Sequence, residues 1–116
     1  SLRRQRQMCI RDRGERALLR YGLESTRVYL PGMAPGIGVE ASAAYGAYLD
    51  NVASTSTINL IHMGGFLSTS KEMGYTYGVM QAANPDGTSF STGYLRQWRF
   101  KENEEWGIAV EVLRPL

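Results

Sequence analysis

The stretch FSTGYLRQWRFKENEEWGIAVEVL, residues 90–113, decides the fold class. In its first part, Phe90 to Phe100, the large aromatic side chains are separated by even numbers of residues, which is the period of a β-strand. Those predicted to share one face are Phe90, Tyr94, Trp98 and Phe100. The charged segment Lys101 to Glu105 predicts a loop, and Trp106 to Leu113 predicts a last strand. The stretch therefore predicts two antiparallel strands joined as a hairpin.

Two further strands precede this hairpin. The segment Met73 to Ala83 alternates along its length, and Asn84-Pro85-Asp86-Gly87 is a strong turn signal after it. The side chains of this segment predicted to share a face are Tyr75, Tyr77 and Val79. The segment Thr57 to Thr69 also alternates, and its Gly64-Gly65 pair predicts a bulge or a sharp bend. Together these segments predict a strongly bent, mainly antiparallel sheet.

The N-terminal half is predicted to form helices and short extended segments. Gly14 to Glu24 has roughly helical spacing and predicts the last turns of a helix whose start is missing, and Ser25 to Leu30 predicts a short strand. Two prolines and three glycines break regular structure from Pro31 to Gly38. Val39 to Leu49 is rich in alanine and predicts a helix that can lie close to a sheet. The order of elements predicts an α+β domain with helices on one face of the sheet.

Composition limits the classes of protein that the chain can belong to. Its 116 residues suffice for one domain, and 43% hydrophobic and 21% charged residues are ordinary values for a globular protein. No apolar run is long enough for a membrane-spanning helix. One cysteine excludes an internal disulfide framework and any metal site built from several cysteines.

The formal charge of +2 is unevenly distributed along the chain. Residues 1–13 carry five arginines and one acid, so the remaining residues, 14–116, hold 8 basic and 10 acidic side chains, a net charge of −2. Residues 3–12 resemble, without a mismatch, the translation of a transposase sequencing-library adapter. We therefore predict that residues 1–13 are adapter-derived and take no part in the fold. The domain proper is then 14–116, with a natural N-terminus that is missing.

Three motifs outside that segment resemble the SnoaL-like domains, which form a superfamily with nuclear transport factor 2 and ketosteroid isomerase. Arg27 to Gly32, with Pro35 and Gly38, nearly repeats a motif of that family, "RVYRPG-x-P-x-x-G". Met73 to Gly78 is similar to its "GDLGYTYG", and Gly93 to Glu111 to its "GYYLRVWRRQ-x-x-G-x-WKIVLD". The resemblance spans residues 25–113. It implies a cone-like fold with helices on the concave face of a bent sheet, a truncated first helix, and an apolar pocket between sheet and helices.

Two residues are candidates for acid–base catalysis, Glu111 and His62. Glu111 replaces the aspartate usual in that family, and strict alternation places it opposite Trp106, Ile108, Val110 and Val112. On a concave face, burial would raise its pKa and suit it to proton transfer. The alternative is a solvent-facing carboxylate paired with Arg96 or Arg99. His62, the only histidine, is suited to act as a general base, or is instead an ordinary packed or surface side chain.

Four residues are candidates for ligand binding. Tyr77, Tyr94 and Trp98 could provide flat apolar walls and a hydroxyl group that orients a carbonyl, or they could be ordinary sheet core. Arg96 could bind an anionic ligand, although alternating arginines usually mark the solvated side of a strand.

Several partners and cofactors have no support in the sequence. His62 lacks carboxylates at metal-ligand spacing, and no glycine-rich loop joins a strand to a helix, so we expect no metal and no cofactor. Without a basic patch beyond the first residues, nucleic-acid binding is not expected, and neither is a membrane partner.

Two functions remain. The first is a small-molecule-binding domain that acts on an apolar carbonyl compound by proton transfer, as an isomerase or cyclase. The second is a non-catalytic ligand-binding or dimerisation module, because the resemblance implies that a homodimer can form through the outer face of the sheet.

Overall fold

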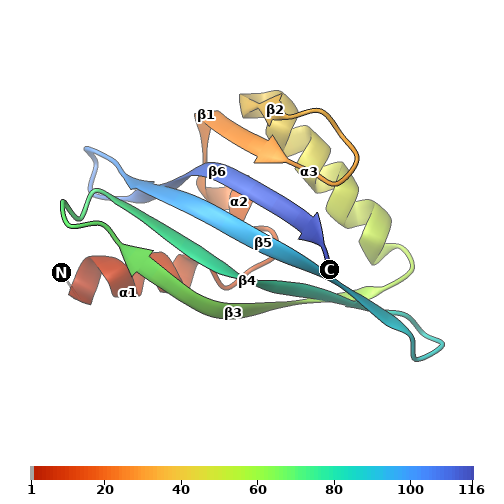
Figure 1. The fold of residues 1–116 in the computed structure, drawn as a ribbon. Helices are drawn as coiled ribbons and strands as arrows, with labels where there is room; N and C mark the ends of the chain where they lie inside the picture. Colours follow the sequence, from red (N-terminus) through yellow and green to blue (C-terminus); the bar gives the residue numbers. More distant parts are fainter. Residues whose placement is uncertain (1) are drawn as a thin grey trace.

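A computed structural model of the chain describes residues 2–116 (Figure 1). Its elements, in chain order, are α1 (Leu2–Arg11), α2 (Ala17–Tyr21), β1 (Gly22–Tyr29), β2 (Gly36–Ile37), α3 (Gly38–Ala53), β3 (Thr57–Leu67), β4 (Met73–Ala83), β5 (Ser89–Phe100) and β6 (Trp106–Pro115). The predicted strands all form, and β1 begins three residues earlier than the sequence pattern indicates. None of the helices among these residues has the length and hydropathy needed to cross a membrane.

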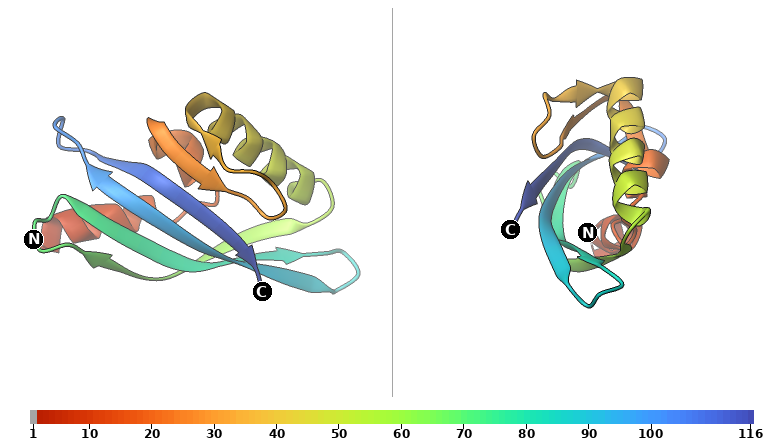
Figure 2. Two further views of the ribbon diagram at one scale, coloured as in Figure 1. Left: turned by 45° about the horizontal axis from the view of Figure 1, so that its top comes forward. Right: turned by 90° about the vertical axis from the view of Figure 1, so that its right-hand side faces the viewer.

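The strands form one six-stranded sheet in the order β2-β1-β6-β5-β4-β3. Only β1 and β6 pair in parallel, and every other neighbouring pair is antiparallel. The sheet is strongly curved, and the right-hand view of Figure 2 shows α3 lying across its concave side. The predicted α+β class and bent, mainly antiparallel sheet with helices on the concave face are confirmed.

A glycine in the left-handed region joins β2 to the long helix. Gly38 begins α3 with a φ of +63°, which favours glycine over residues with a side chain. A Cβ atom at this position would also lie 2.6 Å from the carbonyl oxygen of Glu24 in β1. Gly38 therefore allows the start of α3 to pack closely against the edge of the sheet.

A bulge in β6 changes which side chains face the core. Gln97 pairs with Val110 but Trp98 pairs with Ile108, so Ala109 is an extra residue on β6. The strict alternation predicted for this strand is therefore wrong beyond Ala109. Glu111 shares the concave face with Trp106 and Ile108, whereas Val110 and Val112 turn to the outer face. A second register shift, between His62 and Gly64, confirms the irregularity predicted beside the glycine pair of β3.

Residues 2–13 pack against the sheet, which differs from the expectation that they lie outside the fold. Helix α1 runs beside β3 and β4 (Figure 1). Met8 is fully buried, and its sulfur occupies the space above Gly74, where a Cβ would come within 2.6 Å of it. The physical reason is that α1 carries an apolar side chain that the concave face can bury. The adapter resemblance concerns the origin of these residues and stays a prediction.

Candidate functional site

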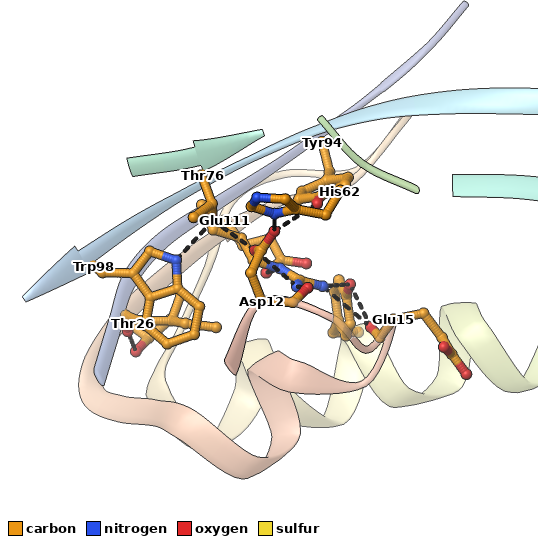
Figure 3. Close-up of polar contacts among 11 residues, drawn as sticks. Asp12, Glu15, Thr26, His62, Thr76, Tyr94, Trp98 and Glu111 are labelled. Atoms are coloured by element: carbon orange, nitrogen blue, oxygen red, sulfur yellow. Dashed lines mark hydrogen bonds and ion pairs between the residues drawn. The ribbon is translucent and has the colours of Figure 1, made fainter. Parts of the chain in front are cut away.

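A cluster of buried polar side chains lies on the concave face, between the sheet and the turn that follows α1 (Figure 3). We call it the polar cluster. Its members are Asp12, Tyr45, His62, Thr76, Tyr94, Arg96, Trp98 and Glu111. All except His62 are buried, and the His62 side chain is 22% exposed. Ionisable side chains at this depth are rarely found unpaired, so their partners define what the cluster can do.

Arg96 and Glu111 form the first pair of the cluster. They face each other across β5 and β6, and Arg96 Nε donates to Glu111 Oε1 over 2.6 Å. Burial raises the pKa of Glu111, and the Arg96 charge opposes that rise. Burial acts to lower the pKa of Arg96, but the Glu111 carboxylate and other neighbours outweigh it, and that pKa lies above its ordinary value. Among the described residues, Glu111 Oε2 has no hydrogen-bond partner.

The Asp12 carboxylate receives four side-chain donors from the sheet. Its Oδ1 accepts from Thr76 Oγ1 at 2.5 Å and from Arg96 Nη1 at 3.2 Å. Its Oδ2 accepts from the Tyr94 hydroxyl at 2.6 Å and from His62 Nδ1 at 2.6 Å. Since an ionised carboxylate only accepts, His62 carries its hydrogen on Nδ1 in this arrangement. Both oxygens of Asp12 are therefore fully supplied, each by two donors.

Neighbouring groups fix these donors in their donating form. Trp98 Nε1 donates to Thr76 Oγ1 over 2.8 Å, so the Thr76 hydroxyl hydrogen is directed at Asp12. Burial, followed by the hydrogen bond and charge of Asp12, raises the pKa of Tyr94 well above its ordinary value. The hydroxyl of Tyr94 therefore stays protonated at any ordinary pH.

Tyr45 closes the cluster on the side of α3. Its hydroxyl donates to the carbonyl oxygen of Glu15 over 2.9 Å and accepts from Arg96 Nη2 over 3.5 Å. Burial raises the pKa of Tyr45, and the Glu111 charge adds to the rise. This residue links the Arg96 guanidinium to the helix that covers the sheet.

The structure brings five of the six predicted site residues together, and they are Glu111, His62, Tyr94, Trp98 and Arg96. Tyr77 is not among them. It lies on the outer face, 42% exposed, because Thr76 and Gly78 take the inward positions of β4. The prediction that Tyr77 shares a pocket with Tyr94 and Trp98 is therefore wrong.

The two arginines of β5 lie in different surroundings. Arg96 is fully buried and Arg99 is exposed, since residues three apart on a strand face opposite sides. The interpretation of both as a solvated side therefore fails for Arg96. Glu111 is buried on the concave face, so the alternative of a solvent-facing carboxylate is wrong, although the pairing with Arg96 that it included does occur.

Sequence reasoning missed three members of the cluster, Asp12, Thr76 and Tyr45. Thr76 stands inside the "GYTYG" motif, where the candidate chosen was its neighbour Tyr77. Tyr45 lies in an alanine-rich helix that also contains Tyr48, and no residue pattern distinguishes the two tyrosines. Asp12 belongs to the segment excluded from the fold, so no reading of residues 14–116 could find it.

A large hollow of the surface lies elsewhere, on the outer face of the sheet. It measures about 660 Å³ and its walls include Phe66, Met73, Tyr75, Leu95, Gln97 and Val110. Its walls contain no Asp, Glu, His, Lys or Arg side chain, and the sheet separates it from the polar cluster. The polar cluster and this hollow therefore lie on opposite faces of the sheet. Within residues 2–116, no three His, Cys, Asp or Glu side chains are grouped so as to hold a metal ion.

Comparisons with known proteins identify the fold. No family model matches the sequence, and no curated protein matches it. A ketosteroid isomerase-like protein from Erwinia carotovora atroseptica is similar in structure, with a TM-score of 0.67 at 15% identity, over 99% of this chain and 89% of that one. An NTF2-like protein of unknown function from Exiguobacterium gives a TM-score of 0.56 at 17% identity, over 99% and 97%. An NTF2-like protein with a cystatin-like fold from Novosphingobium aromaticivorans gives 0.66 at 14% identity, over 98% and 81%. The chain thus has the cone-like α+β fold of nuclear transport factor 2-like and ketosteroid isomerase-like proteins.

Proposed function

We propose that the chain is a small-molecule-binding domain of the SnoaL-like type, with its site at the sheet residues of the polar cluster. The observation that supports this most is the convergence of His62, Tyr94, Arg96 and Glu111 on one buried spot of the concave face. Burying charges costs several kcal/mol per ion even when they are paired, and hydrophobic residues of similar size often stabilise as well. A cluster of this kind is therefore better explained by a ligand than by the stability of the sheet.

The chemistry that suits the cluster is proton transfer on an apolar carbonyl compound. The imidazole of His62 is the ionisable group of the cluster that a ligand entering from solvent meets first, because its side chain alone is partly exposed. With Nδ1–H engaged, its other nitrogen can take a proton from the carbon next to the carbonyl. The Tyr94 hydroxyl and the Arg96 guanidinium would stabilise the negative charge that develops on the carbonyl oxygen.

Glu111 is the second candidate base, since its Oε2 has no partner among the described residues and its pKa is raised by burial. Its bond to Arg96 Nε also makes it a positioning residue for that cation. The two roles differ in what they predict for exchange of substrate hydrogens. A base is needed for every exchange event, whereas a positioning residue can be replaced by an amide with partial loss.

Hydrogen–deuterium exchange tests the proposal directly. Enolisable ketones with apolar bodies are incubated with the protein in heavy water, and loss of the α-proton signal is followed by NMR. Because Tyr94 and Arg96 donate to Asp12 in the unaltered chain, the test uses Asp12→Gly, which frees both donors. We expect exchange with Asp12→Gly, at least a hundredfold loss when His62→Gln is added, and a smaller loss when Glu111→Gln is added. Tyr77→Phe, a change on the outer face, serves as the matched control and keeps full activity. Absence of exchange in Asp12→Gly across the panel, with no saturable quenching of its tryptophan fluorescence, overturns both catalysis and binding.

The alternative, a dimerisation module, is supported by a different observation. Large apolar side chains on the outer face stay exposed, among them Ile61, Phe66, Tyr75, Tyr77 and Leu95. An exposed patch of this kind is typical of a surface that another protein covers. We propose a second copy of this chain as the partner. The two functions are compatible, because they use opposite faces of one sheet.

A further inference from the structure

The groups that donate to Asp12 are positioned by the sheet and not by Asp12 itself. Thr76, Tyr94 and Arg96 stand at alternate, inward-facing positions of β4 and β5, and His62 stands on β3 beside them. All four are held by the strands, as Figure 3 shows for His62, Thr76 and Tyr94. The acceptor comes from outside the sheet, from the turn after α1.

Nothing in the local structure of α1 favours a carboxylate at this place. Asp12 follows the last residue of the helix, and its backbone N–H still donates to the Met8 carbonyl. A negative charge at the C-terminal end of a helix is repelled by the partial negative charge of the free carbonyls. The Asp12 side chain is therefore held by the sheet donors and not by its own helix. It also belongs to the segment that is predicted to be adapter-derived.

We propose that the four sheet donors form a receptor for the carboxylate group of a small carboxylic acid, and that Asp12 occupies this receptor in the present chain. This adds a second ligand class to the function proposed above, on which it rests for the location of the site. Each oxygen of the carboxylate receives two donors, and one of the four is a permanent cation. A ketone offers one oxygen to this set and a carboxamide offers one acceptor and one donor, so both fit it less well.

The charge of the cluster supports the same ligand class. Arg96 contacts two carboxylates, Glu111 and Asp12, and a bound acid would restore the second when Asp12 is replaced. Without an acceptor in this position, Thr76, Tyr94 and Arg96 would be buried donors with unmet hydrogen bonds. Buried donors of that kind favour binding of an anion that satisfies all of them.

Acetate is the probe that tests the receptor, with the full chain carrying Asp12→Gly, because glycine also removes the Cβ whose place the acetate methyl group takes. The melting temperature is measured against rising sodium acetate and, at equal ionic strength, against sodium chloride. We expect the Gly variant to be stabilised by acetate with millimolar half-saturation, following ligand linkage, while the unaltered chain shows no difference between the two salts. Asp50→Ala is the matched control, because it removes a carboxylate from an exposed pair with Arg16 and should show no acetate effect.

A second substitution identifies the donors. Adding Tyr94→Phe to Asp12→Gly removes one of the two donors that meet Oδ2 in the unaltered chain, and we expect acetate affinity to fall about tenfold. An equal response to acetate and chloride in Asp12→Gly overturns the receptor. If this variant is unfolded in chloride, recovery of its far-ultraviolet circular dichroism in acetate supports the proposal.

If it is unfolded in both salts, Asp12→Ala with sodium formate decides the matter. Alanine keeps the Cβ, and formate has no methyl group that would collide with it, so formate should raise the melting temperature. No formate effect in Asp12→Ala overturns the receptor. Acetate binding without ketone exchange would leave the receptor standing and remove the catalytic role. Ketone exchange that depends on His62, without any acetate effect, would overturn the receptor and leave the catalytic role standing.

Discussion

Each face of the sheet carries side chains that are unusual for its surroundings. The concave face, covered by helices, buries Asp12, Arg96 and Glu111 completely, whereas the outer face exposes Phe66 and Leu95. Figure 2 shows how this asymmetry arises, because the helices all lie on the concave side of the curved sheet. Charges inside and apolar side chains outside both lower the stability of an isolated monomer. The comparison teaches that each face keeps side chains that stability alone does not explain, which is why we propose a small molecule as the ligand of the inner face and a second copy of the chain as the partner of the outer face.

Replacing the central cation should give the largest effect. Arg96→Met leaves the Glu111 and Asp12 carboxylates buried without their partner. We expect a loss of about 3–5 kcal/mol in the free energy of unfolding, measured by urea denaturation. The control is Arg99→Met on the exposed side of the same strand, which should change stability by no more than about 0.5 kcal/mol. Equal losses in the two variants would show that the inner face carries no special electrostatic role.

Removing one hydroxyl from the polar cluster should have an intermediate effect. Thr76→Val keeps the shape of the side chain but leaves the indole N–H of Trp98 and one oxygen of Asp12 short of a partner. We expect a loss of about 1–3 kcal/mol in the free energy of unfolding, with a change in tryptophan fluorescence. Thr57→Val, at an exposed position of β3, is the matched change and should be neutral. A neutral Thr76→Val would mean that the cluster tolerates unmet hydrogen bonds.

The raised pKa of Glu111 predicts a pH dependence with a definite sign. A carboxyl whose pKa is higher in the folded than in the unfolded protein binds its proton more tightly when folded. Its contribution to stability is fully present below the unfolded pKa and is lost as the pH rises through the folded pKa. We therefore expect the unaltered chain to lose stability relative to Glu111→Gln with rising pH, by at most about 1.4 kcal/mol per pH unit.

Urea denaturation of both proteins between about pH 4 and pH 7 measures this difference, over the range that begins near the ordinary carboxyl pKa. Asp50→Asn, at an exposed carboxylate, is the control and should follow the unaltered chain. The opposite slope, with Glu111→Gln losing stability relative to the unaltered chain as the pH rises, would mean that the effect of the Arg96 charge on the pKa of Glu111 outweighs that of burial.

The smallest effect on monomer stability is expected on the outer face. Leu95→Lys places a charge beside the apolar hollow, where the side chain is already exposed, so folding should change by no more than about 0.5 kcal/mol. Association should change strongly, because a buried lysine in an apolar interface is costly. Sedimentation equilibrium is expected to show dimers for the unaltered chain and for Asn103→Lys, a loop control, and monomers for Leu95→Lys. Monomers in all three would leave the outer face without a partner of this kind.

The sequence by itself determined the strands, the turn signals and the fold class. Alternation of apolar side chains is a local property, so β4 and β5 could be placed from their own residues, and five of the six predicted site residues do meet. Which face of each strand the helices cover is not a local property of the sequence. Tyr77 and Thr76 alternate equally well in either orientation, and only the position of the helices assigns Thr76 to the core.

Tertiary structure decided the rest, for three physical reasons. The extra residue at Ala109 turns Glu111 inward, and no residue type in WGIAVEVL signals that shift of register. Arg96 is buried because Glu111 and Asp12 stand opposite it, and these partners come from segments 15 and 84 residues away in the chain. Asp12 itself is held by donors on three different strands. Periodicity is set by neighbours in the sequence, whereas burial and charge pairing are set by neighbours in space.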